Sequence, residues 1–162
     1  MTIYAFVASH RIIDLTTVAL LSNGASSVPE TLTSDTAGQL GVEGSVVLAT
    51  CNRLEVYIKL AVPEHLAPVS ELIFAHIAAQ AGLAQEIVSS SFEVYSDLES
   101  AEHLFTVASG LESAVVGERE IAGQVRRALA TAQQAGPVPG ELVQLFEHAA
   151  HTARQVGQHT TI

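Results

Sequence analysis

The alternation of hydrophobic and polar positions divides the chain into two parts. In the first part, short runs rich in Val, Ile, Tyr and Phe are bounded by turn-forming residues, which is typical of strands. These runs are Ile3–Ala8, Ser45–Ala49, Leu54–Leu60 and Phe92–Tyr95. Pro29–Leu40, followed by Gly41, carries the start and stop signals of a helix. Glu64–Ala81 has apolar residues every three or four positions and ends at Gly82, which also predicts a helix.

The order strand, helix, strand, strand, helix, strand is the split βαβ pattern of ferredoxin-like domains. It predicts an α+β fold with a mostly antiparallel sheet and helices on one face. After Ser96 the apolar spacing is helical throughout. Its three stripes are Ala101–Ala108, Ile121–Ala132 and Leu142–Ala153, separated by Gly110 and by the turn at 136–140. We therefore expect one domain over residues 1–162, with a ferredoxin-like part at 1–96 and an all-helical part at 97–162.

The composition excludes several classes of protein. The 162 residues are 48% hydrophobic, with 7 Lys and Arg against 17 Asp and Glu, which gives a formal net charge of -10. A mean hydropathy of +0.34 argues against disorder. The negative charge opposes unaided binding to nucleic acid, because phosphate backbones attract clusters of Lys and Arg.

The ends of the chain carry no targeting signal. The first ten residues lack the basic region of a signal peptide, and no stretch approaches the roughly 18 apolar residues that span a bilayer. We expect a cytoplasmic protein without membrane contact. The chain stops at Ile162 directly after a helical pattern, so we also expect it to be a piece of a longer protein.

Cys51 is the only cysteine, and it falls between two predicted strands in Thr50-Cys51-Asn52-Arg53. A thiol at a hairpin tip is a candidate nucleophile when nearby cations stabilise the thiolate. Arg53 could supply part of that field, or it could bind a carboxylate with its planar donors. The alternative is a small thiol packed in a turn, with Asn52 present because it tolerates left-handed backbone.

Histidines and glycines supply the other candidate chemistry. His103 lies at the edge of a predicted helical stripe and could activate the thiol or donate a proton, although a half-buried structural histidine is the simpler interpretation. His148 and His151 lack a third ligand, so we expect a solvated helix face and no metal site. Gly110–Gly123 holds three glycines, but no dinucleotide or P-loop fingerprint occurs in the chain.

Together these segments resemble the catalytic domain of the glutamyl-tRNA reductase family. The matching segments are Ala49–Tyr57, His103–Ser113, Val116–Glu118 and Ile121–Val125. The resemblance runs from about Ile3 to the end of the chain in the family's order. It implies that an NADPH-binding domain and a dimerisation domain, which continue the family's enzymes, are absent from this chain.

The resemblance implies a two-step reduction in tetrapyrrole (porphyrin and heme) biosynthesis. Cys51 would attack the ester of glutamyl-tRNA to form a thioester, and NADPH bound by the absent domain would reduce it to glutamate-1-semialdehyde. His103 matches a histidine needed for activity, and Arg53 would hold the glutamate carboxylate. The full set of implied substrate contacts is Thr50, Asn52, Arg53, Ser113, Glu118, Arg119, Glu120 and Gln124. The implied partners are glutamyl-tRNA, a second subunit through the absent C-terminal domain, and glutamate-1-semialdehyde aminomutase as a channelling partner.

Three segments depart from the family pattern. Ser9-His10-Arg11-Ile12 stands where the family has Asn-His-Lys-Thr, which removes a threonine hydroxyl. Glu118-Arg119-Glu120 stands for Glu-Pro-Gln and adds a carboxylate, and Glu112 stands for Asp. Two other functions stay open, a noncatalytic regulatory or partner-binding relative and a Cys-His hydrolase.

Overall fold

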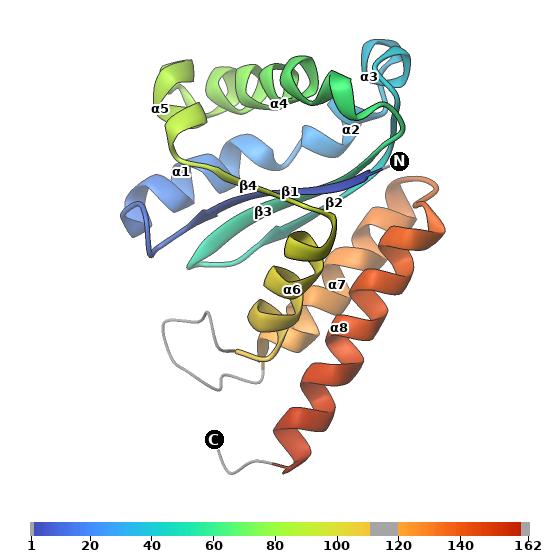
Figure 1. The fold of residues 1–162 in the computed structure, drawn as a ribbon. Coiled ribbons are helices and arrows are strands. Elements are labelled where there is room, and N and C mark those ends of the chain that lie inside the picture. Colours follow the sequence, from blue (N-terminus) through green and yellow to red (C-terminus); the bar gives the residue numbers. More distant parts are fainter. Residues whose placement is uncertain (1, 111–119, 160–162) are drawn as a thin grey trace.

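Four antiparallel strands form one sheet in the middle of the molecule (Figure 1). The computed structural model describes residues 2–110 and 120–159, except the side chains of Glu120 and of residues 154–159. The strands are β1 (Thr2–Ser9), β2 (Val42–Ala49), β3 (Arg53–Leu60) and β4 (Glu93–Ser96). Their order across the sheet is β2-β3-β1-β4, and every neighbouring pair is antiparallel. This is the predicted ferredoxin-like arrangement, and all four strands lie where the periodicity placed them.

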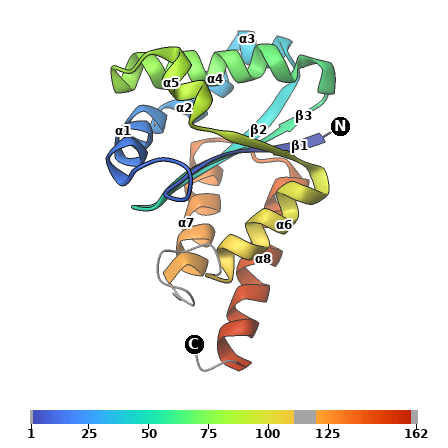
Figure 2. The same ribbon diagram turned by 60° about the vertical axis from the view of Figure 1, so that its left-hand side comes forward.

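Helices of residues 15–90 cover one face of the sheet. They are α1 (Leu15–Ala25), α2 (Val28–Leu32), α3 (Asp35–Gln39), the 3-10 turn η1 (Pro63–His65), α4 (Leu66–Ala81) and α5 (Gln85–Ser90). The layer they form is seen from a second side in Figure 2. Its core joins Phe6, Val56 and Ile58 of the sheet to Leu21 of α1 and Ile73 of α4.

The single helix predicted over Pro29–Leu40 is wrong. Thr33 ends α2, and the Ser34 hydroxyl accepts a hydrogen bond from the backbone N–H of Ala37 and so begins α3. A serine that caps a new helix also interrupts the preceding one, because its backbone is extended.

Helix α1 was not predicted, because turn-forming and β-branched residues interrupt its Leu and Ala positions. It contains two β-branched threonines and an Asn-Gly pair, which is typical of a turn. The side chain of Asp14 caps it by accepting from the N–H of Thr17 at 2.7 Å. Packing then supports the helix, since a Cβ on Gly24 would lie 2.7 Å from the carbonyl oxygen of Ile77 in α4. Glycine at this position lets the two helices approach closely.

Three helices cover the opposite face of the sheet. They are α6 (Asp97–Ala108), α7 (Glu120–Ala135) and α8 (Gly140–His159), as predicted from the apolar stripes after Ser96. Their apolar residues pack with Val7, Val46, Leu48 and Tyr57 in a second core. Both faces of β3 are therefore covered, and all eight of its residues are buried.

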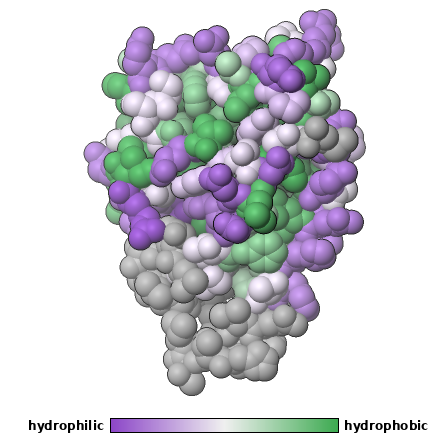
Figure 3. Space-filling model, in the orientation of Figure 1, coloured by the Kyte–Doolittle hydropathy of each residue, from purple (hydrophilic) through white to green (hydrophobic). Residues whose placement is uncertain are grey.

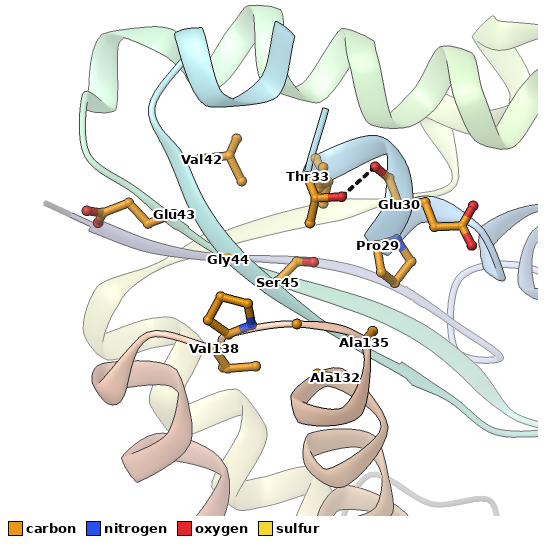
Figure 4. Close-up of a pocket in the computed structure, with 13 residues that line it drawn as sticks. Pro29, Glu30, Thr33, Val42, Glu43, Gly44, Ser45, Ala132, Ala135 and Val138 are labelled. Carbon is orange, nitrogen blue, oxygen red and sulfur yellow. Dashed lines mark hydrogen bonds between the residues drawn. The ribbon is translucent and has the colours of Figure 1, made fainter. Parts of the chain in front are cut away.

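The turn between α7 and α8 packs against the beginning of β2. Pro139 contacts Gly44 so closely that no Cβ fits there. A pocket of about 230 Å³ lies beside this contact, between α2, β2 and the turn (Figure 4). It is at the end of β2 far from Cys51, because Val42–Ser45 line it.

Hydrophobic and hydrophilic residues are interspersed over the sheet and upper helices on the face drawn in Figure 3. The larger exposed apolar residues include Ile12, Leu15, Ile87 and Leu98, which come from different elements. No helix in the described part of the chain is both long enough and apolar enough to cross a membrane.

Candidate functional site at the β2–β3 hairpin

A three-residue loop joins β2 to β3 and presents the cysteine at its tip. The N–H of Thr50 donates to the carbonyl of Arg53 at 2.9 Å, and the N–H of Asn52 donates to the Thr50 hydroxyl at 3.2 Å. The N–H of His10, just after β1, donates to the carbonyl of Asn52 at 2.9 Å. The loop is thus held from both sides, and Thr50 acts as a positioning residue within it.

Cys51 is exposed, so its thiol is accessible to a substrate. The alternative of a thiol packed in a turn is wrong for this structure. The left-handed backbone suggested for Asn52 is wrong too, because Asp97 is the one non-glycine residue with positive φ in the described ranges. The hairpin therefore leaves the Cys51 thiol accessible, as a nucleophile requires.

Directly behind the loop, β3 carries a buried polar network. Nη1 of Arg53 donates to Oε2 of Glu55 at 2.8 Å, and the hydroxyl of Tyr57 donates to Oε1 of Glu55 at 2.7 Å. Nε2 of His103, from α6, lies 2.9 Å from the same Oε2. The side chains of Arg53 and Glu55 are 1% and 0% exposed, and that of His103 is 12% exposed. Residues 53, 55 and 57 share one face of the strand because side chains alternate, and this face lies under the helices of the second core.

The network keeps the carboxylate of Glu55 ionised. Burial alone would raise the pKa of Glu55, but the hydrogen bond and charge of His103, the charge of Arg53 and the Tyr57 hydroxyl together lower it. Burial and the neighbouring Glu55 charge raise the pKa of Tyr57 well above its ordinary value. Tyr57 is therefore a hydrogen-bond donor to a fixed anion.

The carboxylate also determines which nitrogen of His103 carries a proton. An ionised carboxylate only accepts hydrogen bonds, so Nε2 must be the donor in the 2.9 Å contact. The ring stacks on Tyr95 with centroids 5.0 Å apart, which fixes its plane. In the neutral ring Nδ1 is then the basic nitrogen. Within the part of the chain that is described, no hydrogen bond joins His103 to Cys51. His103 is hydrogen-bonded to Glu55 instead.

The remaining predicted contacts are divided between the hairpin and α7. Thr50 and Asn52 flank the cysteine and are half-buried. Gln124 lies on α7 and lines a pocket together with Ala49, the last residue of β2. The predicted contacts Ser113, Glu118 and Arg119 lie outside the described residues, as does the side chain of Glu120.

Two histidines considered for metal binding lie on the exposed side of α8. His148 and His151 both line a groove between α7 and α8. Among the described residues, no group of three His, Cys, Asp or Glu side chains could hold a metal ion.

Sequence reasoning missed Glu55 and Tyr57 as members of the site. The available signal was the alternation Arg53, Glu55, Tyr57, Lys59 within a strand whose other residues are apolar. Polar residues on a strand that is covered on both faces require partners, because a buried polar group without a hydrogen bond is costly. Lys59 follows the same rule, with Nζ 2.8 Å from Oε2 of Glu141 and 3.3 Å from Oε2 of Glu43.

The fold and this site define an α+β domain of ferredoxin-like topology that presents a cysteine in front of a buried arginine, glutamate and histidine. A family model described as glutamyl-tRNAGlu reductase, N-terminal domain, matches residues 7–160. The chain belongs to this family.

Individual relatives agree with that assignment. The chain is 51% identical to glutamyl-tRNA reductase from Kocuria rhizophila over 164 residues, covering 99% of this chain and 36% of the relative. It is 48% identical to the enzyme of that name from Pseudarthrobacter chlorophenolicus, covering all of this chain and 36% of the relative. The solved structure of glutamyl-tRNA reductase from Methanopyrus kandleri matches 98% of this chain and 35% of its own, with a TM-score of 0.73 and 27% identity. The chain thus spans about a third of the length of the relatives it matches.

Proposed function

We propose that this domain forms the thioester intermediate of glutamyl-tRNA reduction at Cys51. One observation carries the proposal: the exposed thiol lies at the tip of a hairpin held at both ends, directly in front of the Arg53–Glu55–His103 network. Membership of the reductase family supports glutamyl-tRNA as the substrate.

The proposed step is an acyl transfer. The Sγ thiolate of Cys51 attacks the ester carbonyl carbon, a C–S bond forms, and the C–O bond to the terminal ribose of the tRNA breaks. The ribose oxygen takes up a proton as it leaves. We assign His103 to the movement of that proton, because Glu55 holds its ring in one orientation. The product is a thioester, which accepts hydride more readily than an oxygen ester.

Arg53 is proposed to recognise the side-chain carboxylate of the glutamyl group. Its guanidinium already donates to Glu55 and is 1% exposed. A substrate carboxylate would therefore reach this guanidinium by moving inward past the loop. Thr50, Asn52 and Gln124, together with Ser113, Glu118, Arg119 and Glu120, are the further proposed substrate contacts.

The described residues do not fit the reductant that the family implies, NADPH. Strand pairs in the described sheet are all antiparallel, whereas dinucleotide sites of the common type use parallel strands and a glycine-rich turn. We therefore assign to this chain the acyl transfer alone. The binding of NADPH belongs, in this proposal, to residues beyond this chain.

The wider setting follows from the same proposal. The product of the complete enzyme would be glutamate-1-semialdehyde for tetrapyrrole synthesis, formed in the cytoplasm. We also propose that the complete enzyme forms a homodimer through further domains. Its aldehyde product would pass to an aminomutase.

The test is to mix the chain with glutamyl-tRNA, quench in acid and measure the intact protein mass. We expect one glutamyl group on the wild type and none on Cys51→Ser, with glutamate released slowly as water hydrolyses the thioester. The adduct should be cleaved by neutral hydroxylamine, which distinguishes a thioester from an amide. NADPH should not be oxidised by this chain.

Alkylation provides the control for reactivity. Cys51 should react with iodoacetamide faster than a model thiol at neutral pH. A cysteine of ordinary reactivity that takes up no glutamyl group would favour the noncatalytic, partner-binding relative and contradict the proposal.

A further inference from the structure

A polar pocket lies where the end of β2, the strand that leads to the Cys51 loop, meets the middle of α7. Its volume is about 300 Å³. One wall is Val47–Ala49 of β2, and the other is formed by Gln124, Arg127, Ala128 and Thr131 of α7. The chain continues from Ala49 into Thr50 and Cys51, so the thiol follows this wall by two residues.

The α7 wall carries three different polar groups on one helix face. Gln124, Arg127 and Thr131 are spaced by three and four residues, so their side chains lie one above another. They offer an amide, a guanidinium and a hydroxyl. The opposite wall is an edge strand, since β2 pairs with β3 alone. Edge strands have outward backbone N–H and C=O groups that a ligand can use.

The guanidinium of Arg127 points toward the hairpin that carries the thiol. Gly123 precedes it by one turn of α7, and a Cβ built on Gly123 would lie 3.3 Å from Nη1 of Arg127. The guanidinium is therefore folded back toward the beginning of the helix. Helix α7 runs antiparallel to β2, because Ala132 and Ala135 line the pocket at the start of β2 whereas Gln124 and Thr131 line the one at its end. Folding back thus brings Arg127 toward the hairpin tip.

The charge of Arg127 is not used by the described part of the fold. Ion pairs found there include those of Glu55 with Arg53 and His103 and those of Lys59 with Glu43 and Glu141. No described acidic side chain pairs with Arg127, which is exposed. In a chain with a net charge of -10, a cation without such a partner beside the nucleophile favours an anionic ligand.

Resting on the thioester function proposed above, we propose that this pocket binds the terminal ribose and phosphate of the aminoacylated RNA. The ester carbonyl that Cys51 attacks is bonded to that ribose, so the terminal nucleotide must lie within a few bonds of Sγ during the reaction. Arg127 binds the phosphate by a charge-assisted contact. Gln124 contacts the one free hydroxyl of the esterified ribose, and Thr131, two turns farther from the hairpin along α7, donates to the phosphate. The glutamyl group occupies the hairpin side and the nucleotide the α7 side of the same thiol.

Two substrates and two variants test this assignment. One substrate is a glutamylated RNA minihelix ending in CCA; the other is 3′-O-glutamyladenosine, which has the ribose but no phosphate. The variants are Arg127→Gln and, as matched control, Arg126→Gln, whose side chain lines the separate groove between α7 and α8. The readout is the single-turnover acylation of Cys51 as a function of substrate concentration.

Arg127→Gln should raise the half-saturating concentration of the minihelix by roughly tenfold or more, the usual weight of a charged hydrogen bond. It should leave acylation by 3′-O-glutamyladenosine unchanged and should reduce the salt dependence of minihelix binding. Arg126→Gln should leave the acylation of Cys51 by either substrate unchanged. Equal losses on both substrates, or equal effects of the two variants, would overturn the proposal.

Two further measurements separate other outcomes. Binding of a fluorescent minihelix that carries no glutamyl group tests the pocket without acylation. Loss of affinity in Arg127→Gln but not in Arg126→Gln supports the RNA-binding pocket, even if no thioester forms and the proposed function fails. The other source of a ribose phosphate is a dinucleotide. If NADPH competes with the minihelix in the wild type and not in Arg127→Gln, the pocket belongs to the dinucleotide and the assignment to RNA is wrong.

Discussion

Nε2 of His103 and Nη1 of Arg53 meet at the same oxygen of one buried residue, Glu55: Oε2 lies 2.9 Å from the imidazole nitrogen and 2.8 Å from the guanidinium. The carboxylate thereby links a helix on one face of the sheet to the residue that begins β3. Both partners of this Oε2 atom are residues that the proposed reaction uses. Glu55 is accordingly a positioning residue whose effect on chemistry passes through His103 and Arg53.

The first prediction concerns the proton on His103. Because an ionised carboxylate only accepts, Nε2 should carry a proton and donate it to Oε2 of Glu55. Nitrogen-15 NMR of the imidazole at neutral pH measures this directly. In Glu55→Gln the amide can donate or accept, so the preference should weaken. An unprotonated Nε2 in the wild type would show that the contact with Glu55 is not the one described.

The second prediction compares two substitutions in β3 by their effect on the free energy of unfolding. Glu55→Gln removes the buried carboxylate that pairs with Arg53 at 2.8 Å and should destabilise the chain by about 3–5 kcal/mol. Tyr57→Phe removes one hydrogen bond to a charged group and should cost less, about 1.5–3 kcal/mol. Urea denaturation measures both. A larger cost for Tyr57→Phe than for Glu55→Gln would contradict the central place of the carboxylate.

The third prediction concerns acid. The folded-state pKa of Glu55 is lowered, so the unfolded chain binds this proton more readily than the folded one. The stabilisation is fully present above the ordinary glutamate pKa and is lost as the pH falls through the lower, folded pKa. The free energy of unfolding should therefore decrease in that window. Glu55→Gln should show a smaller decrease between the same pH values, and identical slopes in the two proteins would contradict the pKa shift.

The fold was predictable where the periodicity is simple. The four strands have β-branched and aromatic runs, and the long helices carry regular apolar stripes, so local pattern and burial agree. Helix α1 was not predicted because contacts with α4 stabilise it. Gly24, which has a low helix propensity, is the residue that allows α4 to approach. Single-sequence patterns contain no information on such a partner.

The site was predictable only in part, for a similar reason. Cys51, Arg53 and His103 were identified from motif segments and exposed-loop chemistry. The polar alternation along β3 indicates that Glu55 needs a buried partner, but it does not say which residue that partner is. Its role appears only when α6 brings His103 across 48 residues of sequence to the same oxygen. The ion pair of Arg53 with Glu55 likewise has no sequence signature, and it appears only in the folded chain, where Arg53 is 1% exposed.

The last prediction tests the helix contact that the sequence concealed. Gly24→Ala places a methyl group 2.7 Å from the backbone carbonyl of Ile77 and 3.1 Å from Cβ of Ala81, so α1 and α4 must move apart. Overpacking of this kind costs about 1–3 kcal/mol. Gly38→Ala is the matched control, because Gly38 lies in α3 and a Cβ there meets nothing within 4 Å. That substitution should stabilise the chain by up to about 1 kcal/mol, since alanine favours helix over glycine. Thermal and urea unfolding of the two variants should therefore shift in opposite directions, and a neutral Gly24→Ala would mean that the α1–α4 contact is looser than described.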